Sequence, residues 1–263
     1  MDGGLNELNK TGISWTDLTW NPVSGCSKVS PGCQNCYAEA WSHRWHRSFD
    51  VTLHPDKLKE VKKIPPGSKV FVNSMSDLFH ERVPFTFIWG VIKAIESRPD
   101  VTFQVLTKRP ERISEYFYYM SNHRKFGNGG DHEMYTFPDN LWLGVSVEMR
   151  LYLSRMTELI KLDLEGIGYK MKFVSFEPLL GDIGRVNFNP LSYDGISWII
   201  IGGESGPHHR PMKIEWARNL VRQAKEQGVA VWMKQLGGLR PGGDLEDFPE
   251  DLRIREFPVE VLK

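Results

Sequence analysis

Short apolar segments recur along the chain and alternate with segments of helical periodicity, and this alternation limits the fold more than any other feature of the sequence. Seven runs rich in apolar or β-branched residues lie at 13–20, 70–74, 101–107, 141–147, 172–176, 198–201 and 229–233. Several are apolar almost throughout, as expected of parallel strands that are covered on both faces. Segments 84–97, 152–160 and 214–224 place their apolar residues on one side of a helix.

The spacing of these elements predicts one α/β domain built on a parallel sheet. Strand and helix alternate roughly every 30 residues, which is typical of βαβ units, and 263 residues are enough for one barrel. We expect a full or partial TIM-like (β/α) barrel at residues 13–238, and an open doubly wound sheet is the alternative. A polar segment (1–12) precedes this single domain, a loop insertion (121–140) interrupts it, and a C-terminal extension (239–263) follows it.

Charge and hydropathy exclude several classes of protein. The chain has 33 Lys and Arg against 33 Asp and Glu, a balance that disfavours non-specific coating of nucleic acid. With 40% hydrophobic and 25% charged residues, the chain is not expected to be disordered. Its start lacks the basic and apolar blocks of a signal peptide, and no apolar run approaches the ~20 residues of a membrane helix. We therefore expect a cytoplasmic protein with no membrane contact.

Polar residues follow the apolar runs, and in a parallel α/β fold the functional site lies at the carboxyl ends of the strands. The residues at these positions are Asn73, Ser74, Asp77, Lys108, Arg109, Ser146, Glu148, Glu177, Gly202, Gly203 and Glu204. Four of them are acids in equivalent positions on different strands. Strand ends are polar in many α/β proteins, so each residue taken singly has a purely structural alternative. Residues 208–210 (His-His-Arg) follow the glycine-rich segment and are either a substrate loop or an exposed turn.

Three cysteines lie close together, at Cys26, Cys33 and Cys36, in a loop after the first predicted strand. An odd number does not suit a disulfide framework. Three thiolates can anchor a [4Fe–4S] cluster and leave one iron open to a ligand. A closed zinc site with a Cys3His ligand set is the rival interpretation, and unmetallated thiols are the third. The histidines that can complete the zinc set are His43, His46 and His54. The position of the loop at the carboxyl ends of the strands favours a cofactor-binding cluster.

The cysteine motif, the aromatic Tyr37 after its last cysteine and the Gly-Gly-Glu segment at 202–204 together resemble the radical S-adenosylmethionine superfamily. Six and then two residues separate the cysteines, whereas the commonest pattern of that superfamily has three and then two. More closely, the chain resembles a phage-associated family that carries a three-cysteine motif and has no settled function. The matching stretches lie at 13–17, 20–22, 26–39, 71–80, 106–110, 142–148, 176–181, 202–207 and 234–235.

The resemblance implies an enzyme in which Cys26, Cys33 and Cys36 hold a [4Fe–4S] cluster. The cluster would bind S-adenosylmethionine and cleave it reductively, and the radical so formed would abstract hydrogen from a substrate. Cofactor contacts are expected from Tyr37, Asn73, Ser74, Asp77, Ser146, Glu148, Glu177, Gly202 and Gly203. The catalytic candidates are Lys108, Arg109 and Glu204. The two basic residues can hold a carboxylate or a phosphate. The expected partners are an electron donor and a companion protein.

The expected substrate is a nucleobase, free or in nucleic acid, that is modified or repaired. Nine tryptophans and the strand-end basic residues suit stacking on bases and contacts with phosphates, and phage association points the same way. Two other classes of function stay open. One is a zinc-containing, non-catalytic module that binds nucleic acid or a protein partner. The other is a hydrolase or another ordinary barrel enzyme that uses the strand-end carboxylates as acid and base, with the cysteines structural.

Overall fold

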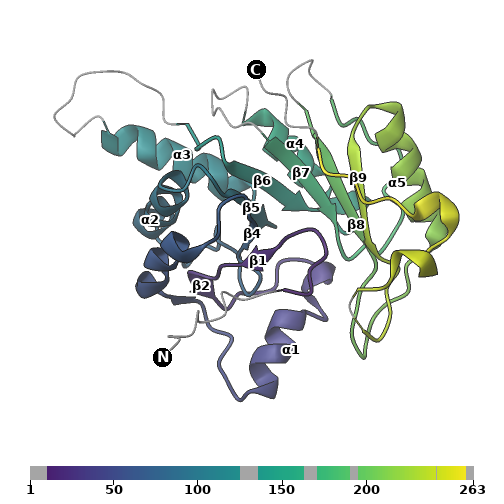
Figure 1. Cartoon of the computed structure of the whole chain (residues 1–263), viewed down its shortest axis with the longest axis horizontal. Helices are drawn as coiled ribbons and strands as arrows, with labels where there is room; N and C mark the ends of the chain where they lie inside the picture. The colour runs from purple at the N-terminus through teal and green to yellow at the C-terminus, as the bar shows by residue number, and fades with distance from the viewer. Residues whose placement is uncertain (1–10, 125–135, 163–170, 190–194, 241, 259–263) are drawn as a thin grey trace.

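Seven parallel strands form a curved sheet. A computed structural model describes residues 11–124, 136–162, 171–189, 195–240 and 242–258. The strands are β1 (Leu18–Thr19), β4 (Lys69–Val72), β5 (Thr102–Thr107), β6 (Leu141–Ser146), β7 (Met171–Phe176), β8 (Trp198–Gly202) and β9 (Ala230–Gln235). They pair in the order β1-β4-β5-β6-β7-β8-β9, and every neighbouring pair is parallel. Because β1 and β9 remain as edges, the sheet is a partial barrel (Figure 1).

The strand order follows the order of the chain, which rules out the doubly wound alternative. Right-handed crossovers that all advance in one direction place their helices on one face of the sheet. The helices that follow strands are α2 (Phe85–Glu96), α3 (Glu111–Arg124), α4 (Ser154–Lys161) and α5 (Ile214–Glu226). The predicted partial TIM-like α/β fold is therefore confirmed.

A smaller unit interrupts the barrel between β1 and β4. It contains a two-stranded antiparallel ribbon, β2 (Val23–Ser24) with β3 (Thr52–Leu53), and the helix α1 (Tyr37–Arg44). Short 3-10 helices complete the described structure: η1 (Pro31–Cys33), η2 (Pro55–Lys63), η3 (Arg150–Tyr152), η4 (Leu245–Asp247) and η5 (Glu250–Leu252). The unit between β1 and β4 carries the three cysteines.

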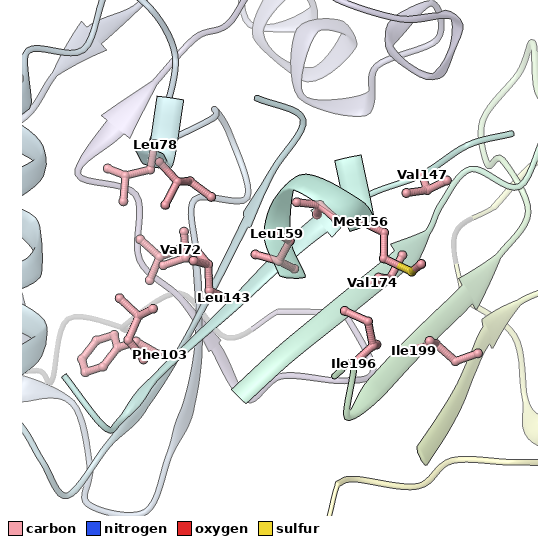
Figure 2. Close-up of a cluster of buried hydrophobic side chains, with 14 of the residues drawn as sticks. Val72, Leu78, Phe103, Leu143, Val147, Met156, Leu159, Val174, Ile196 and Ile199 are labelled. Carbon is pink, nitrogen blue, oxygen red and sulfur yellow. The ribbon is translucent and has the colours of Figure 1, made fainter. Parts of the chain in front are cut away.

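The larger hydrophobic core lies between the outer face of the sheet and its helices. Figure 2 shows part of this core, where Leu143 of β6 and Val174 of β7 lie beside Met156 and Leu159 of α4. Leu143 of β6 is completely buried there. Since each fully buried aliphatic side chain contributes about 1.5–3 kcal/mol, this layer supplies much of the driving force for folding.

Replacement of Leu143 by Ala should lower the free energy of unfolding by about 2–5 kcal/mol, because it removes buried methyl groups and leaves a cavity. Urea denaturation would measure the change. Leu151 is the matched control because 76% of its surface is exposed, and Leu151→Ala should change stability by no more than about 0.5 kcal/mol. Equal effects of the two substitutions would contradict the described core.

A second, aromatic core fills the inside of the barrel near the amino ends of the strands. Its central ring is Trp198, which lies 6.1 Å from Trp15, 5.8 Å from Trp142 and 5.5 Å from Phe173 between ring centroids. Side chains alternate between the two faces along a strand. Residues nearer the carboxyl ends, such as Ser146 and Ser175, therefore face the same interior above these rings.

Several sequence-based boundaries differ from the structure. In the first predicted strand, 13–20, only Leu18–Thr19 pairs with the sheet, although Trp15 still enters the inner core. The helix α3 includes the first four residues of the expected insertion, and 125–135 lie outside the described residues. The described part of the C-terminal extension packs on the barrel: Trp232 bridges to Arg255, and Phe257 lies 5.5 Å from Trp198 between ring centroids.

Two further expectations concern the division of the chain into segments and its relation to a membrane. The division into segments 1–12, 13–238 and 239–263 stays a prediction. None of the helices in the described part of the chain has both the length and the apolar character needed to cross a membrane.

Candidate functional site

The cysteine loop, residues 25–36, runs from the end of β2 to the start of α1 beside the carboxyl ends of the strands. Its first residue, Gly25, forms a parallel bridge with Ser76 and donates a backbone hydrogen bond to Met75 at 3.0 Å. Gly25 has a φ of +80°, and a Cβ there would lie 2.1 Å from the carbonyl oxygen of Asp50. Only glycine therefore allows the loop to leave the ribbon in this direction.

The first attachment of the loop is a buried pair between Asp77, after β4, and Arg109, after β5. Arg109 Nη1 lies 3.1 Å from Asp77 Oδ2 and 3.6 Å from Cys26 Sγ, while Nη2 donates to the Ser27 carbonyl at 3.1 Å. Asp77 also accepts hydrogen bonds from the Thr107 hydroxyl and from the backbone amides of residues 79 and 108. Its carboxylate is thus fully engaged by the protein.

The environment of this pair keeps the Cys26 thiol protonated. Burial, and secondarily the Asp77 charge, raise its pKa to about 11, and Arg109 only partly opposes this effect. A metal ion or cluster that binds Cys26 therefore has to displace a proton.

The second attachment is made by Glu148, which follows β6 and is completely buried. It accepts a short hydrogen bond from the Ser30 hydroxyl and a 2.8 Å bond from Arg155 Nη1 of α4. A Cβ on Gly32 would lie 2.3 Å from Glu148 Cγ. The glycine lets the turn η1 come down directly onto this carboxylate.

The third attachment is made by Glu204, which follows β8. Arg210 binds it through Nε at 2.9 Å, through Nη2 and through its backbone amide at 2.8 Å, and Asn35 donates to it at 2.9 Å. Arg210 also donates to the Pro31 carbonyl at 3.0 Å. Burial raises the pKa of Glu204, but the hydrogen bonds from Arg210 and Asn35 outweigh it, so the pKa lies below its ordinary value.

The fourth strand-end acid, Glu177, faces the interior of the barrel. Its Oε1 lies 2.9 Å from Lys234 Nζ of β9, and its Oε2 accepts a 3.1 Å hydrogen bond from Ser175. A Cβ on Gly202 would lie 2.5 Å from Glu177 Oε1, and one on Gly203 would lie 2.3 Å from the Leu236 carbonyl. Close approach of the protein itself thus accounts for both glycines.

Other predicted residues take part in hydrogen bonds within the scaffold. Ser74 exchanges hydrogen bonds with Asn21, and its carbonyl accepts one from Tyr37. The Ser146 carbonyl accepts a 2.9 Å hydrogen bond from Arg155.

Asn73 is different, because both polar atoms of its buried amide lack a hydrogen-bond partner among the described residues. Such a group costs about 1–3 kcal/mol, so a ligand that pairs with Asn73 would remove a penalty of the unliganded fold. Lys108 is half-buried and uses its backbone amide to bind Asp77. Its ammonium forms no hydrogen bond or ion pair within the described part of the chain.

Comparison with known proteins places the chain in a family. The model of a family described as "Protein of unknown function (DUF5131)" matches residues 10–250. The chain belongs to this family. The description of the DUF5131 family names no phage association, so that part of the sequence-based expectation stays a prediction. No curated protein matches the chain.

Solved structures similar to this DUF5131 member are those of spore photoproduct lyase. A cysteine-to-serine mutant shares 13% identity over 84% of this chain and 64% of the lyase chain, with a TM-score of 0.49. The complex with dinucleoside spore photoproduct shares 13% over 85% and 66%, with a TM-score of 0.46. A double mutant with bound AdoMet and the same ligand shares 12% over 84% and 64%, with a TM-score of 0.47. Similarity at this level identifies neither a cofactor nor a substrate for the chain.

The donor chemistry of the loop in this DUF5131 member fits an iron–sulfur cluster. All three thiols are free and half-buried, and Cys26 and Cys33 are near enough to interact electrostatically. However, no three His, Cys, Asp or Glu side chains of the described residues are grouped as metal ligands. Binding therefore requires the thiols to turn toward a common point. Among the histidines that could complete a zinc site, His54 is a weaker candidate, because its Nε2 is already hydrogen-bonded with the Ser24 hydroxyl at 2.7 Å.

Sequence reasoning missed the partners of the strand-end acids. Arg155 lies on α4 and has no motif around it, and Asn35 is a polar residue in a polar loop. In the sequence, Arg210 belongs to a segment that is either a substrate loop or an exposed turn, and Lys234 belongs to one of the stretches that match the resembled family. The one sequence signal that pointed to such pairs was the presence of several acidic and basic residues, whose opposite charges can pair.

Replacement of Arg210 by Gln should loosen the cysteine loop. The loss of charge-assisted hydrogen bonds to Glu204 and Pro31 should lower the free energy of unfolding by about 2 kcal/mol. The Cys33 and Cys36 thiols of the metal-free protein should also react several-fold faster with iodoacetamide. Arg218→Gln is the control, because Arg218 forms an exposed pair with Asp251. Unchanged alkylation rates in Arg210→Gln would show that Arg210 does not restrain the loop.

Proposed function

We propose that the protein is a radical S-adenosylmethionine enzyme whose [4Fe–4S] cluster is held by Cys26, Cys33 and Cys36. The observation that carries this proposal is the fixation of a loop with three free thiols beside the carboxyl ends of a partial barrel, by three buried carboxylates that each have an arginine partner. A merely structural zinc site needs no such attachment to the functional end of a sheet.

The cluster, when bound, would supply an electron for reductive cleavage of S-adenosylmethionine and so make hydrogen abstraction from a substrate possible. The protein's own residues would bind and orient the cofactor. Glu177 and Lys234 offer opposite charges in the interior of the barrel, and these suit the ammonium and carboxylate of an amino acid. The unpaired amide of Asn73 can both donate to and accept from a ribose hydroxyl.

The catalytic candidates separate into two kinds in this proposal. Arg109 and Glu204 are positioning residues, since their charged groups bind the cysteine loop and its supports. The ammonium of Lys108 stays available to bind a carboxylate or a phosphate. A basic group next to the cysteine loop suits an anionic substrate.

Each of the three cysteines should be essential for loading with a cluster. After anaerobic reconstitution the wild-type protein should be brown and contain about four irons with matching sulfide. Cys26→Ala, Cys33→Ala and Cys36→Ala should each lose the electron paramagnetic resonance signal of the reduced cluster and all cleavage of S-adenosylmethionine. Stoichiometric zinc without sulfide, or full activity of any one variant, would falsify the proposed ligand set.

Replacement of Lys234 by Met should weaken S-adenosylmethionine binding without removing the cluster. Loss of one charge-assisted contact of about 1.4 kcal/mol or more corresponds to at least a tenfold increase in Kd. Isothermal titration calorimetry on the reconstituted protein would measure the Kd, and iron content would be measured in parallel. Lys225→Met, on α5, is the control. Unchanged affinity in Lys234→Met would remove the Glu177–Lys234 pair from the proposed cofactor site.

A further inference from the structure

Two tryptophans of α1 are exposed to an unusual degree. Trp41 exposes 47% and Trp45 exposes 60% of its surface, whereas tryptophans such as Trp15 and Trp198 are almost fully buried. The two indole rings are neighbours, with centroids 6.3 Å apart and planes tilted by 53°. Exposed aromatic side chains that are grouped in this way are typical of an interaction surface.

Positive charge surrounds these rings. Arg44 and Arg47 are exposed, and the Arg47 guanidinium lies 5.7 Å from the centroid of the Trp41 ring. Glu39 is the single acid between positions 37 and 47, and Lys28 pairs with it at 2.8 Å. The tryptophan–arginine patch, defined as Trp41, Arg44, Trp45 and Arg47, is therefore locally basic on a chain of zero net charge.

The position of the patch connects it with the candidate site. Helix α1 begins directly after Cys36, and five residues of helix place Trp41 about 8 Å further along its axis. Ala38 and Ser42 are the buried residues of α1, so most of the helix surface is open. Figure 1 shows α1 apart from the helices that cover the sheet. A ligand on the patch would thus lie next to the cysteine loop.

We propose that the tryptophan–arginine patch binds single-stranded nucleic acid. Bases would stack on Trp41 and Trp45, and phosphates would pair with Arg44 and Arg47. Indole faces accept any base, and arginines bind the backbone without reading sequence. An acidic redox protein would use the same positive charges, but it would not need two adjacent, flat indole rings. The inference deepens the proposed function by assigning its substrate to nucleic acid, while binding at the patch itself does not depend on the cluster.

Fluorescence anisotropy of a labelled oligothymidylate with the metal-free protein tests this proposal. Trp45→Ala should raise Kd by about fivefold or more, as expected for the loss of one stacked base, and Trp45→Phe should recover most of the affinity. Arg44→Gln and Arg47→Gln should each reduce the slope of log K against log salt concentration by about 0.7. All four side chains are exposed, so these variants are expected to fold, and thermal denaturation would verify this.

Trp89→Ala is the matched control, because Trp89 exposes 41% of its surface but lies on α2. The proposal is overturned if the wild-type protein does not bind the oligonucleotide, or if Trp89→Ala weakens binding as much as Trp45→Ala. It is also overturned if Arg44→Gln and Arg47→Gln impair binding of an acidic flavodoxin while all variants retain the same affinity for oligothymidylate. Binding without S-adenosylmethionine cleavage after reconstitution would contradict the proposed function alone, and cleavage without binding would contradict the patch alone.

Discussion

The candidate site depends on the attachment of the cysteine loop by Asp77, Glu148 and Glu204. A buried carboxylate is costly unless it is paired and hydrogen-bonded, and removal of one partner leaves a charge that the protein interior cannot solvate. Here each carboxylate is paired with an arginine. Glu148 and Glu204 also accept hydrogen bonds from the loop residues Ser30 and Asn35, and Asp77 is connected to the loop through Arg109. The position of the three thiols is therefore coupled to the electrostatics of the strand ends.

The three acids follow β4, β6 and β8, which alternate around the barrel. In a curved parallel sheet, inward-facing residues of alternate strands lie at the same height. One loop that crosses the end of the barrel can consequently bind Glu148 and Glu204 directly and Asp77 through Arg109. The residues after the intervening strands have other partners. Arg109, after β5, pairs with Asp77, and Glu177, after β7, pairs with Lys234 in the interior.

The architecture was readable from the sequence because apolar runs and helical stripes are local patterns. The same patterns predicted that four acids would gather at one edge of the sheet. Which acid meets which partner was not predictable, because Ser30 and Glu148 are 118 residues apart and Asn35 and Glu204 are 169 apart. Such contacts depend on the three-dimensional path of the loop. The first strand was overestimated because Ile13 and Trp15 are apolar for packing in the inner core and not for pairing in the sheet.

The division of the strand-end residues indicates where a ligand can bind. Asp77 and Glu204 each accept four hydrogen bonds, and Glu148 is completely buried, so recognition falls to the groups that remain. These are Asn73 with an unpaired buried amide, the Glu177–Lys234 pair and the ammonium of Lys108. Below them the buried rings around Trp198 fill the amino end of the barrel. A low local dielectric strengthens charge-assisted contacts, so a small number of polar groups is enough to orient a zwitterionic ligand beneath the cysteine loop.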